Sequence, residues 1–155
     1  MELLIPANPG ETPRPVAKIA SGGELSRMML AIKTVLASTD TVDTLIFDEV
    51  DTGISGSAAE KVGLKLREVS KSSQVLCVTH LPQIAAMADT EFTVEKRVEN
   101  GRTYTSVLRL DVAGRRQELA RLIGGSMITE TTLAGAAELL RLAEQTKKGA
   151  SHEST

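Results

Sequence analysis

The chain has 155 residues and a net charge of -2, with 18 lysines and arginines against 20 acids, and only 2% of its residues are aromatic. The near-neutral charge excludes a simple basic nucleic-acid clamp, and the scarcity of aromatics excludes a module that stacks single-stranded bases. No apolar stretch approaches the roughly 20 residues of a membrane span. The first residues lack the basic start of a signal peptide, and a single cysteine, Cys77, excludes an internal disulfide or a cysteine-based zinc site. We therefore expect a cytoplasmic protein without a membrane partner.

The first fifteen residues are expected to be irregular, because four of the five prolines fall there and proline removes a backbone donor and disfavours helix before itself. Regular structure should begin near Val16. Ser21 and Glu24 have the spacing of a capping box, and apolar residues then recur at helical intervals over residues 25–36. A single lobe is expected over residues 16–145, followed by a polar, disordered tail over 146–155.

The remaining elements follow from short apolar runs and from turn residues. Residues 44–47 and 74–79 are predicted to be buried strands, and the Asn100-Gly101 pair predicts a hairpin between residues 91–98 and 103–110. A second capping box, Ser57 with Glu60, precedes a helical pattern that ends near Val69. Three further helices are expected: a short one after Pro82, and two over residues 117–123 and 131–142.

Strands that alternate with helices in this order predict an α/β fold, with a mostly parallel sheet flanked by helices, a β-hairpin and two C-terminal helices. In such sheets the chemistry gathers at the carboxyl ends of the strands. Asp48 and Glu49 follow the first strand, where one acid could hold a metal while the other faces a water molecule. They could equally be acids that begin a loop.

His80 ends the next strand and should lie at the same edge, where it could contact a phosphate or serve as a structural hydrogen-bonding group. Ser21-Gly22-Gly23-Glu24 opens a helix, and glycines there allow a ligand to approach the backbone closely. Free N–H groups and the helix dipole make this a candidate anion site, although Ser21 could be a plain N-cap. Cys77 is expected to be a small core residue.

Taken together, these motifs resemble a known family. Residues 20–27 (Ala-Ser-Gly-Gly-Glu-Leu-Ser-Arg) resemble the signature motif of ABC-type ATPases, in the form typical of SMC-like DNA-repair proteins. Residues 44–49 resemble the Walker B strand, residues 50–56 stand where the D-loop follows, and Val78-Thr79-His80 resembles the switch-histidine strand. The resemblance covers about residues 3–145.

The resemblance implies a role for each matching residue. Asp48 would support Mg²⁺ through a water molecule. Glu49 would be the general base or the group that orients the attacking water, and His80 would sense the γ-phosphate of ATP. The nucleotide-binding residues would be Ser21, Gly22, Gly23 and Glu24, which face a nucleotide held mainly by the opposing subunit. The D-loop residues Asp51, Thr52, Gly53 and Ser55 would line the dimer interface. Many relatives have aspartate where Ser55 stands, which leaves its role open.

No Gly-x-x-x-x-Gly-Lys-Ser/Thr phosphate loop occurs in the sequence. In the family this loop lies in an N-terminal half, separated from the matching half by two coiled-coil arms, so the chain resembles the C-terminal lobe of an ATPase head. The implied partners are the N-terminal half, a second head in an ATP-dependent dimer, and DNA for the intact protein. The implied function is DNA double-strand-break repair and recombination at the bacterial nucleoid. Without the phosphate loop, we expect weak ATP affinity and negligible turnover.

Three other functions remain open. A transporter-type ATPase subunit would keep the fold, but such subunits usually have proline and glutamine where this chain has Val50 and Glu24. Asp48, Glu49 and Asp51 could instead form a metal-dependent phosphoesterase site. The lobe could also be a non-catalytic dimerisation module.

Overall fold

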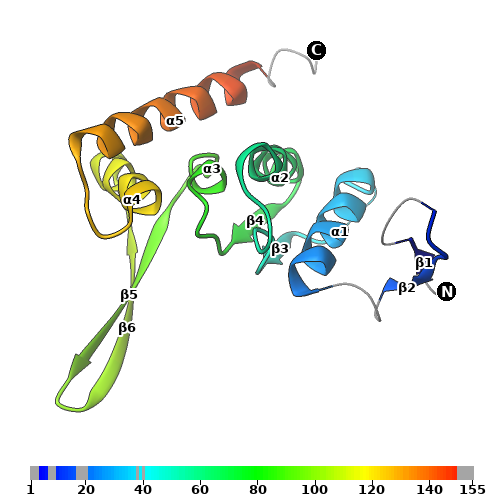
Figure 1. The fold of residues 1–155 in the computed structure, drawn as a ribbon, viewed down its shortest axis with the longest axis horizontal. Coiled ribbons are helices and arrows are strands. Elements are labelled where there is room, and N and C mark those ends of the chain that lie inside the picture. The colour runs from blue at the N-terminus through cyan, green and yellow to red at the C-terminus, as the bar shows by residue number, and fades with distance from the viewer. Residues whose placement is uncertain (1–3, 7–9, 17–20, 38, 40, 150–155) are drawn as a thin grey trace. The chain divides into compact units, whose positions relative to one another are not determined.

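The computed structural model describes residues 4–6, 10–16, 21–37, 39 and 41–149. The chain divides into two compact units, residues 1–79 and residues 80–155. Apart from one short pair of strands near the N-terminus, the elements are those that the sequence pattern predicts, with some shifted boundaries (Figure 1).

In the described part of the first unit, two helices accompany a parallel pair of strands and a short antiparallel pair near the N-terminus. Helix α1 spans Gly22–Val35 and helix α2 spans Gly56–Val69. Strands β3 (Thr44–Phe47) and β4 (Gln74–Cys77) pair in parallel, with Phe47 opposite Cys77. The carboxyl ends of both strands therefore lie at one edge, where the sequence analysis placed the acidic residues.

The parallel pair is buried on one face and open on the other. Phe47 is 3% exposed, whereas Ile46 is 72% exposed and Val78 is 64% exposed. Successive side chains of a strand point to opposite faces, so the exposed residues share one face. The prediction that both strands are fully buried is therefore wrong for this face.

The two predicted capping boxes have different outcomes. Ser21 and Glu24 form the first box, with both reciprocal hydrogen bonds present, which confirms the prediction. The second is wrong: α2 begins at Gly56 after Ser55, two residues before the expected first helical residue, and Ser55 makes no side-chain cap. Gly56 has φ of +51° at this turn, a conformation that glycine adopts without steric cost.

The proline-rich start contains one pair of very short strands, β1 (Leu4–Ile5) and β2 (Arg14–Pro15), which pair antiparallel. The sequence did not predict these strands. The first residue of the predicted lobe, Val16, is buried.

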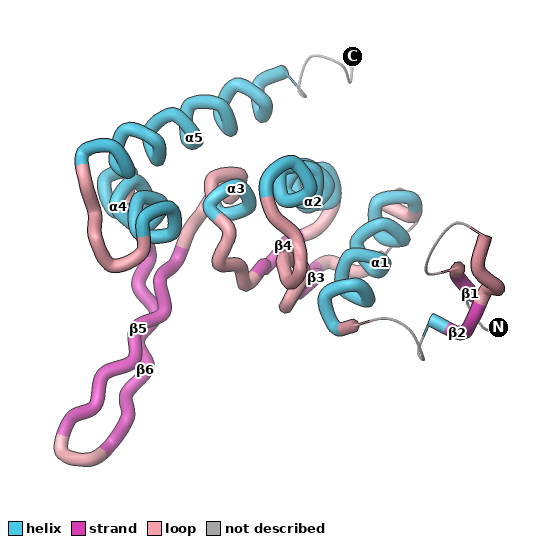
Figure 2. The backbone as a smooth tube through the Cα atoms, in the orientation of Figure 1, coloured by secondary structure: helices cyan, strands magenta, loops and turns pink. Residues whose placement is uncertain are grey.

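The second unit, as described to residue 149, contains a long hairpin and three helices (Figure 2). Strands β5 (Phe92–Glu99) and β6 (Arg102–Arg109) pair antiparallel as predicted. Asn100 and Gly101 both have positive φ, 50° and 73°, as a type I′ turn requires. The helices are α3 (Pro82–Ala85), α4 (Val112–Gly124) and α5 (Glu130–Gly149).

The core of this unit lies between α3, α4 and α5, and its buried members are five alanines and one leucine. They are Ala85, Ala86, Leu119, Ala120, Ala136 and Ala143. Small side chains allow helix backbones to approach closely, which suits a chain with so few aromatic residues.

Helix α5 extends further than the sequence predicted. The polar segment after residue 145 was expected to be disordered, but the helix continues to Gly149. The Lys147 ammonium donates to the carbonyl of Ala88 at 2.9 Å and also contacts Asp89 and Glu144. These contacts explain why the last turn is ordered. Residues 150–155, the rest of the predicted tail, lie outside the described residues.

Candidate functional site

The candidate site lies in the first unit, where the start of α1 meets the segment that follows β3. At the start of α1, the Ser21 backbone N–H donates to Glu24 Oε2 at 2.8 Å, and the Glu24 N–H donates to Ser21 Oγ at 3.4 Å. The hydrogen bonds from the Ser21 backbone and hydroxyl hold the pKa of Glu24 below its usual value. The remaining first-turn N–H groups have no acceptor inside the helix, and the positive end of the helix dipole favours an anion there.

Asp48 and Glu49 follow β3 directly, and both are exposed. The Glu49 backbone N–H donates to Asp48 Oδ1 at 2.9 Å. Glu49 has φ of +57°, a left-handed conformation that costs a residue with a Cβ about 1–2 kcal/mol. Such strain persists only where the surrounding structure holds it, and it is concentrated at functional sites.

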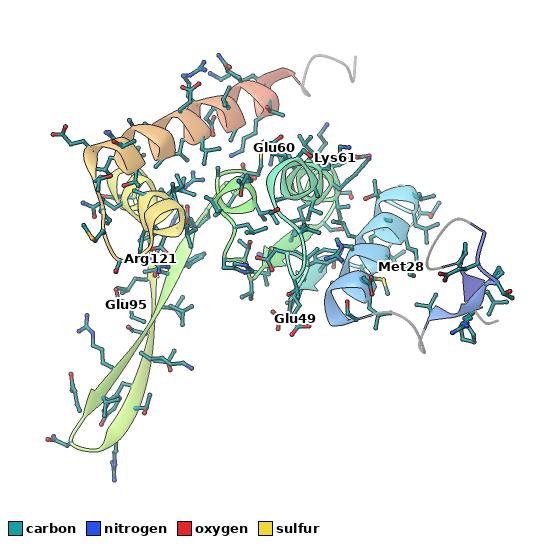
Figure 3. All side chains as sticks on the ribbon, in the orientation of Figure 1. Met28, Glu49, Glu60, Lys61, Glu95 and Arg121 are labelled. Atoms are coloured by element: carbon teal, nitrogen blue, oxygen red, sulfur yellow. The ribbon has the colours of Figure 1, made fainter. Side chains whose placement is uncertain are left out.

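The two signature glycines pack against the segment after β3. A Cβ at Gly23 would lie 2.9 Å from the Glu49 carbonyl oxygen and 3.0 Å from the Thr52 carbonyl oxygen. A Cβ at Gly22 would collide with Oε2 of the Glu49 side chain. Figure 3 shows the labelled Glu49 beside the N-terminal end of α1. Because both residues are glycines, the start of α1 can contact residues 49–52, which follow β3.

The D-loop residues differ in their exposure. Asp51 is only 3% exposed, and it accepts a hydrogen bond of 2.6 Å from Thr79 Oγ1. Thr52, Gly53 and Ser55 are exposed, and Gly53 has φ of +76°. The buried Asp51 thus holds the loop to Thr79 by a hydrogen bond. The other three predicted interface residues are exposed to solvent.

Cys77 is the last residue of β4, near the carboxylates of Asp51 and Asp48. Burial, together with the nearby carboxylates of Asp51 and Asp48, raises the pKa of the Cys77 thiol to about 12. The thiol is therefore protonated at neutral pH. Cys77 is only half-buried, so it lies at the margin of the core and not within it as the sequence predicted.

Most of the predicted site residues are brought together in this unit. They are the signature residues Ser21, Gly22, Gly23 and Glu24, the acids Asp48 and Glu49, and the D-loop residues from Asp51 to Ser55. His80 is exposed and follows Thr79 as the first residue of the second unit, so its role at the phosphate stays a prediction.

Three polar residues at the site were missed as functional candidates. Ser26 and Arg27 donate to backbone carbonyls of residues 48–52, and Thr79 donates to Asp51. Their partners are 22 to 28 residues away in the sequence. Two of them, Ser26 and Arg27, stand out in the sequence as polar residues between apolar ones, but nothing there identifies the carbonyls that they bind.

The donor set fits a magnesium ion bound together with phosphates. Within the described ranges, no three His, Cys, Asp or Glu side chains gather closely enough to hold a metal by themselves. Mg²⁺ in nucleotide sites takes one or two protein carboxylates and otherwise water and phosphate oxygens. The exposed carboxylate of Asp48, at the end of β3, can supply such a ligand.

Comparisons with known proteins show which sequences and folds this chain is similar to. The chain is 55% identical over 137 residues to the DNA repair protein RecN of Vibrio cholerae, which covers 88% of the chain and 25% of that protein. The chain is homologous to RecN. The RecN proteins of Bacillus subtilis and Treponema pallidum are 48% and 50% identical over 147 and 149 residues, covering 95% and 96% of the chain and 26% of each protein. The chain thus spans about a quarter of the length of its RecN relatives. No family model matches.

A solved structure shares the fold. It comes from work on the ATP-driven dimerization and DNA-stimulated activation of SMC ATPases, and it aligns with a TM-score of 0.52 over 80% of this chain and 81% of its own. At 21% identity this match shows the fold alone. The RecN homology and the SMC ATPase fold confirm the resemblance drawn from the sequence motifs. None of the helices in the described ranges is long and apolar enough to cross a membrane.

Proposed function

We propose that this chain supplies the signature, Walker B and D-loop elements of an ATP-hydrolysing head in a RecN-type, SMC-like repair protein. The observation that carries the proposal is the contact between the signature glycines and Glu49. It joins a helix N-terminus suited to an anion with an acid suited to activate water, both in one unit. The homology to RecN supports the same function.

Each site residue has a proposed role. Asp48 is the residue that would hold Mg²⁺, which when bound neutralises phosphate charge in ATP hydrolysis. Glu49 orients the attacking water and accepts its proton. Ser21, Gly22 and Gly23 bind the γ-phosphate through the start of α1, Glu24 holds Ser21 in place, and His80 senses the same phosphate.

The proposed partners follow from two exposed surfaces of this chain, an apolar face of the strands and the D-loop. The exposed apolar face of β3 and β4 includes Ile46, Leu76 and Val78, which are 72%, 46% and 64% exposed. We propose that an N-terminal half carrying the phosphate loop covers this face. The exposed D-loop residues Thr52, Gly53 and Ser55 would meet a second head, with ATP between the two. DNA would bind the intact protein, which would act in the cytoplasm at the nucleoid.

One alternative loses support from the burial of Asp51. A phosphoesterase site made of Asp48, Glu49 and Asp51 needs all three carboxylates to face one metal centre. Asp51 is 3% exposed and accepts the Thr79 hydroxyl. The homology to RecN argues against a transporter-type ATPase subunit. A measurement of ATP hydrolysis distinguishes an ATPase from a non-catalytic dimerisation module.

The experiment measures ATP hydrolysis by this chain alone, and by this chain mixed with a separately made N-terminal half that carries a phosphate loop. We expect activity in the mixture only, and loss of that activity in Glu49→Gln. Glu60→Gln, on the exposed surface of α2, is the matched control and should keep the activity. A folded mixture without activity would favour a dimerisation module, and activity of this chain alone would show that another phosphate-binding site exists.

A further inference from the structure

Two side chains of α1 bind backbone carbonyls on both sides of Glu49. Ser26 Oγ donates to the carbonyl oxygen of Asp48 at 2.6 Å. One guanidinium nitrogen of Arg27 donates to the carbonyl oxygens of Val50 at 3.2 Å and of Thr52 at 2.7 Å. Both side chains are half-buried. They lie one turn beyond the signature glycines, so the same helix that begins the anion site is bonded to the acidic segment.

The three acceptor carbonyls lie on both sides of Glu49 in the sequence, and Glu49 is the residue with the left-handed φ. The Asp48 carbonyl belongs to the peptide that joins Asp48 to Glu49, so a hydrogen bond that holds it restricts both ψ of Asp48 and φ of Glu49. The Thr52 N–H also donates to the Glu49 carbonyl at 3.0 Å, which closes a turn over residues 49–52. A left-handed residue with a Cβ needs its surroundings to hold it, and the hydrogen bonds from Ser26 and Arg27 are suited to do so.

The hydrogen bonds of Arg27 are stronger than ordinary ones. A guanidinium is always charged, and hydrogen bonds with an ionised donor are roughly twice as strong as neutral ones. Its target carbonyls belong to Val50, which is fully buried, and to Thr52, whose backbone abuts Gly23. Arg27 therefore holds the D-loop against the start of α1.

We propose that Ser26 and Arg27 are positioning residues for ATP hydrolysis. They fix the carboxylate of Glu49 by bonding the backbone on both sides of it to α1, without touching the nucleotide themselves. A displacement of the helix that starts at the signature glycines would then move Glu49 and the D-loop with it. This inference rests on the proposed ATPase function.

The test uses the intact RecN-type protein that contains these residues, in the variants Ser26→Ala, Arg27→Ala and Arg27→Lys. Removing a group that acts only on catalytic geometry lowers kcat and leaves KM unchanged. We expect kcat to fall about tenfold in Arg27→Ala, with KM within about twofold, and Arg27→Lys to recover part of the loss, because lysine keeps the charge but loses the guanidinium fork. Arg141→Ala removes an exposed arginine paired within α5, and it should leave both constants unchanged.

A second measurement needs no ATP and remains informative if a variant is less stable. Hydrogen exchange of the backbone amides over residues 49–54 should speed up in Ser26→Ala and Arg27→Ala while the amides of β5 keep their rates. Unchanged exchange over residues 49–54, or an unchanged kcat in an active Arg27→Ala protein, would overturn this inference alone. A fall in kcat together with faster exchange throughout the chain, including the amides of β5, would also overturn it, because that result indicates general destabilisation. An intact wild-type protein that does not hydrolyse ATP would instead overturn the proposed function.

Discussion

The hydroxyl of Thr79 donates a 2.6 Å hydrogen bond to the carboxylate of Asp51, 28 residues earlier in the chain. This bond joins the end of β4 to the loop after β3, at the edge where the two parallel strands end. Asp51 is buried, and a buried carboxylate that loses a donor pays a desolvation penalty. The loop that follows Glu49 is therefore anchored to the neighbouring strand.

We expect Thr79→Val to lower the free energy of unfolding by about 1–3 kcal/mol, because the substitution keeps the shape of the side chain but removes the donor to a buried acceptor. Urea denaturation measures the change. Thr105→Val, on the exposed surface of β6, is the matched control and should change stability by less than about 0.5 kcal/mol. Equal losses in both variants would mean that the Thr79 bond contributes nothing specific.

The two signature glycines should differ sharply in their tolerance of alanine. At Gly23 a Cβ would press against backbone atoms of Glu49 and Thr52, which cannot turn aside, so Gly23→Ala should cost about 1–3 kcal/mol. At Gly22 the Cβ would meet only the end of the flexible Glu49 side chain, so Gly22→Ala should cost less than about 1 kcal/mol. Thermal and urea unfolding of the two variants side by side test this order. A Gly22→Ala protein less stable than Gly23→Ala would contradict the packing of Glu49.

The sequence predicted the elements that depend on local patterns. Strand β3 has the predicted bounds, the Ser21 and Glu24 capping box is present, and the Asn100-Gly101 turn has the expected left-handed φ values. These features follow from side-chain periodicity and from backbone preference, both of which can be read over a few residues.

Features that depend on distant partners could not be predicted. Lys147 looks like part of a polar tail, yet its ammonium reaches the carbonyl of Ala88. Ser26 and Arg27 bind carbonyls of residues 48–52, and every residue type has such a carbonyl, so the sequence leaves no trace of the pairing. The start of α2 was misjudged because Ser57 and Glu60 have the spacing of a capping box without forming one.

Glu91 should make the second unit less stable as the pH rises. Glu91 is 8% exposed and forms an ion pair of 3.1 Å with Arg115. Burial raises the pKa of Glu91 above its usual 4.5, and the hydrogen bond and charge of Arg115 oppose this rise only in part. The folded chain therefore keeps this proton to a higher pH than the unfolded chain, so the contribution of Glu91 is most favourable below about pH 4.5 and declines as the pH passes the folded pKa.

The free energy of unfolding of Glu91→Gln, compared with wild type from pH 4 to 7, measures this contribution. Glutamine keeps an oxygen acceptor for Arg115 and does not titrate, so the variant should gain stability relative to wild type as the pH rises. Glu99→Gln, at the exposed end of the hairpin, is the matched control. A Glu91→Gln protein that loses stability relative to wild type as the pH rises would show that the ion pair with Arg115 outweighs the cost of burial.

Cys77 should react slowly with thiol reagents while the first unit is folded. The thiolate is the reactive form of cysteine, and burial with the nearby Asp51 and Asp48 carboxylates raises the pKa of Cys77 from 9.0 to about 12. At pH 8 the thiolate fraction should therefore be about 1,000-fold smaller than in the unfolded chain, and alkylation by iodoacetamide should slow by a similar factor. Asp48→Asn removes one of the two charges and should speed the reaction modestly, whereas Glu60→Gln, with no contribution to this pKa, should not change it. Folded protein that is alkylated as fast as protein in urea would show that the thiol is open to solvent and that the acidic edge does not control it.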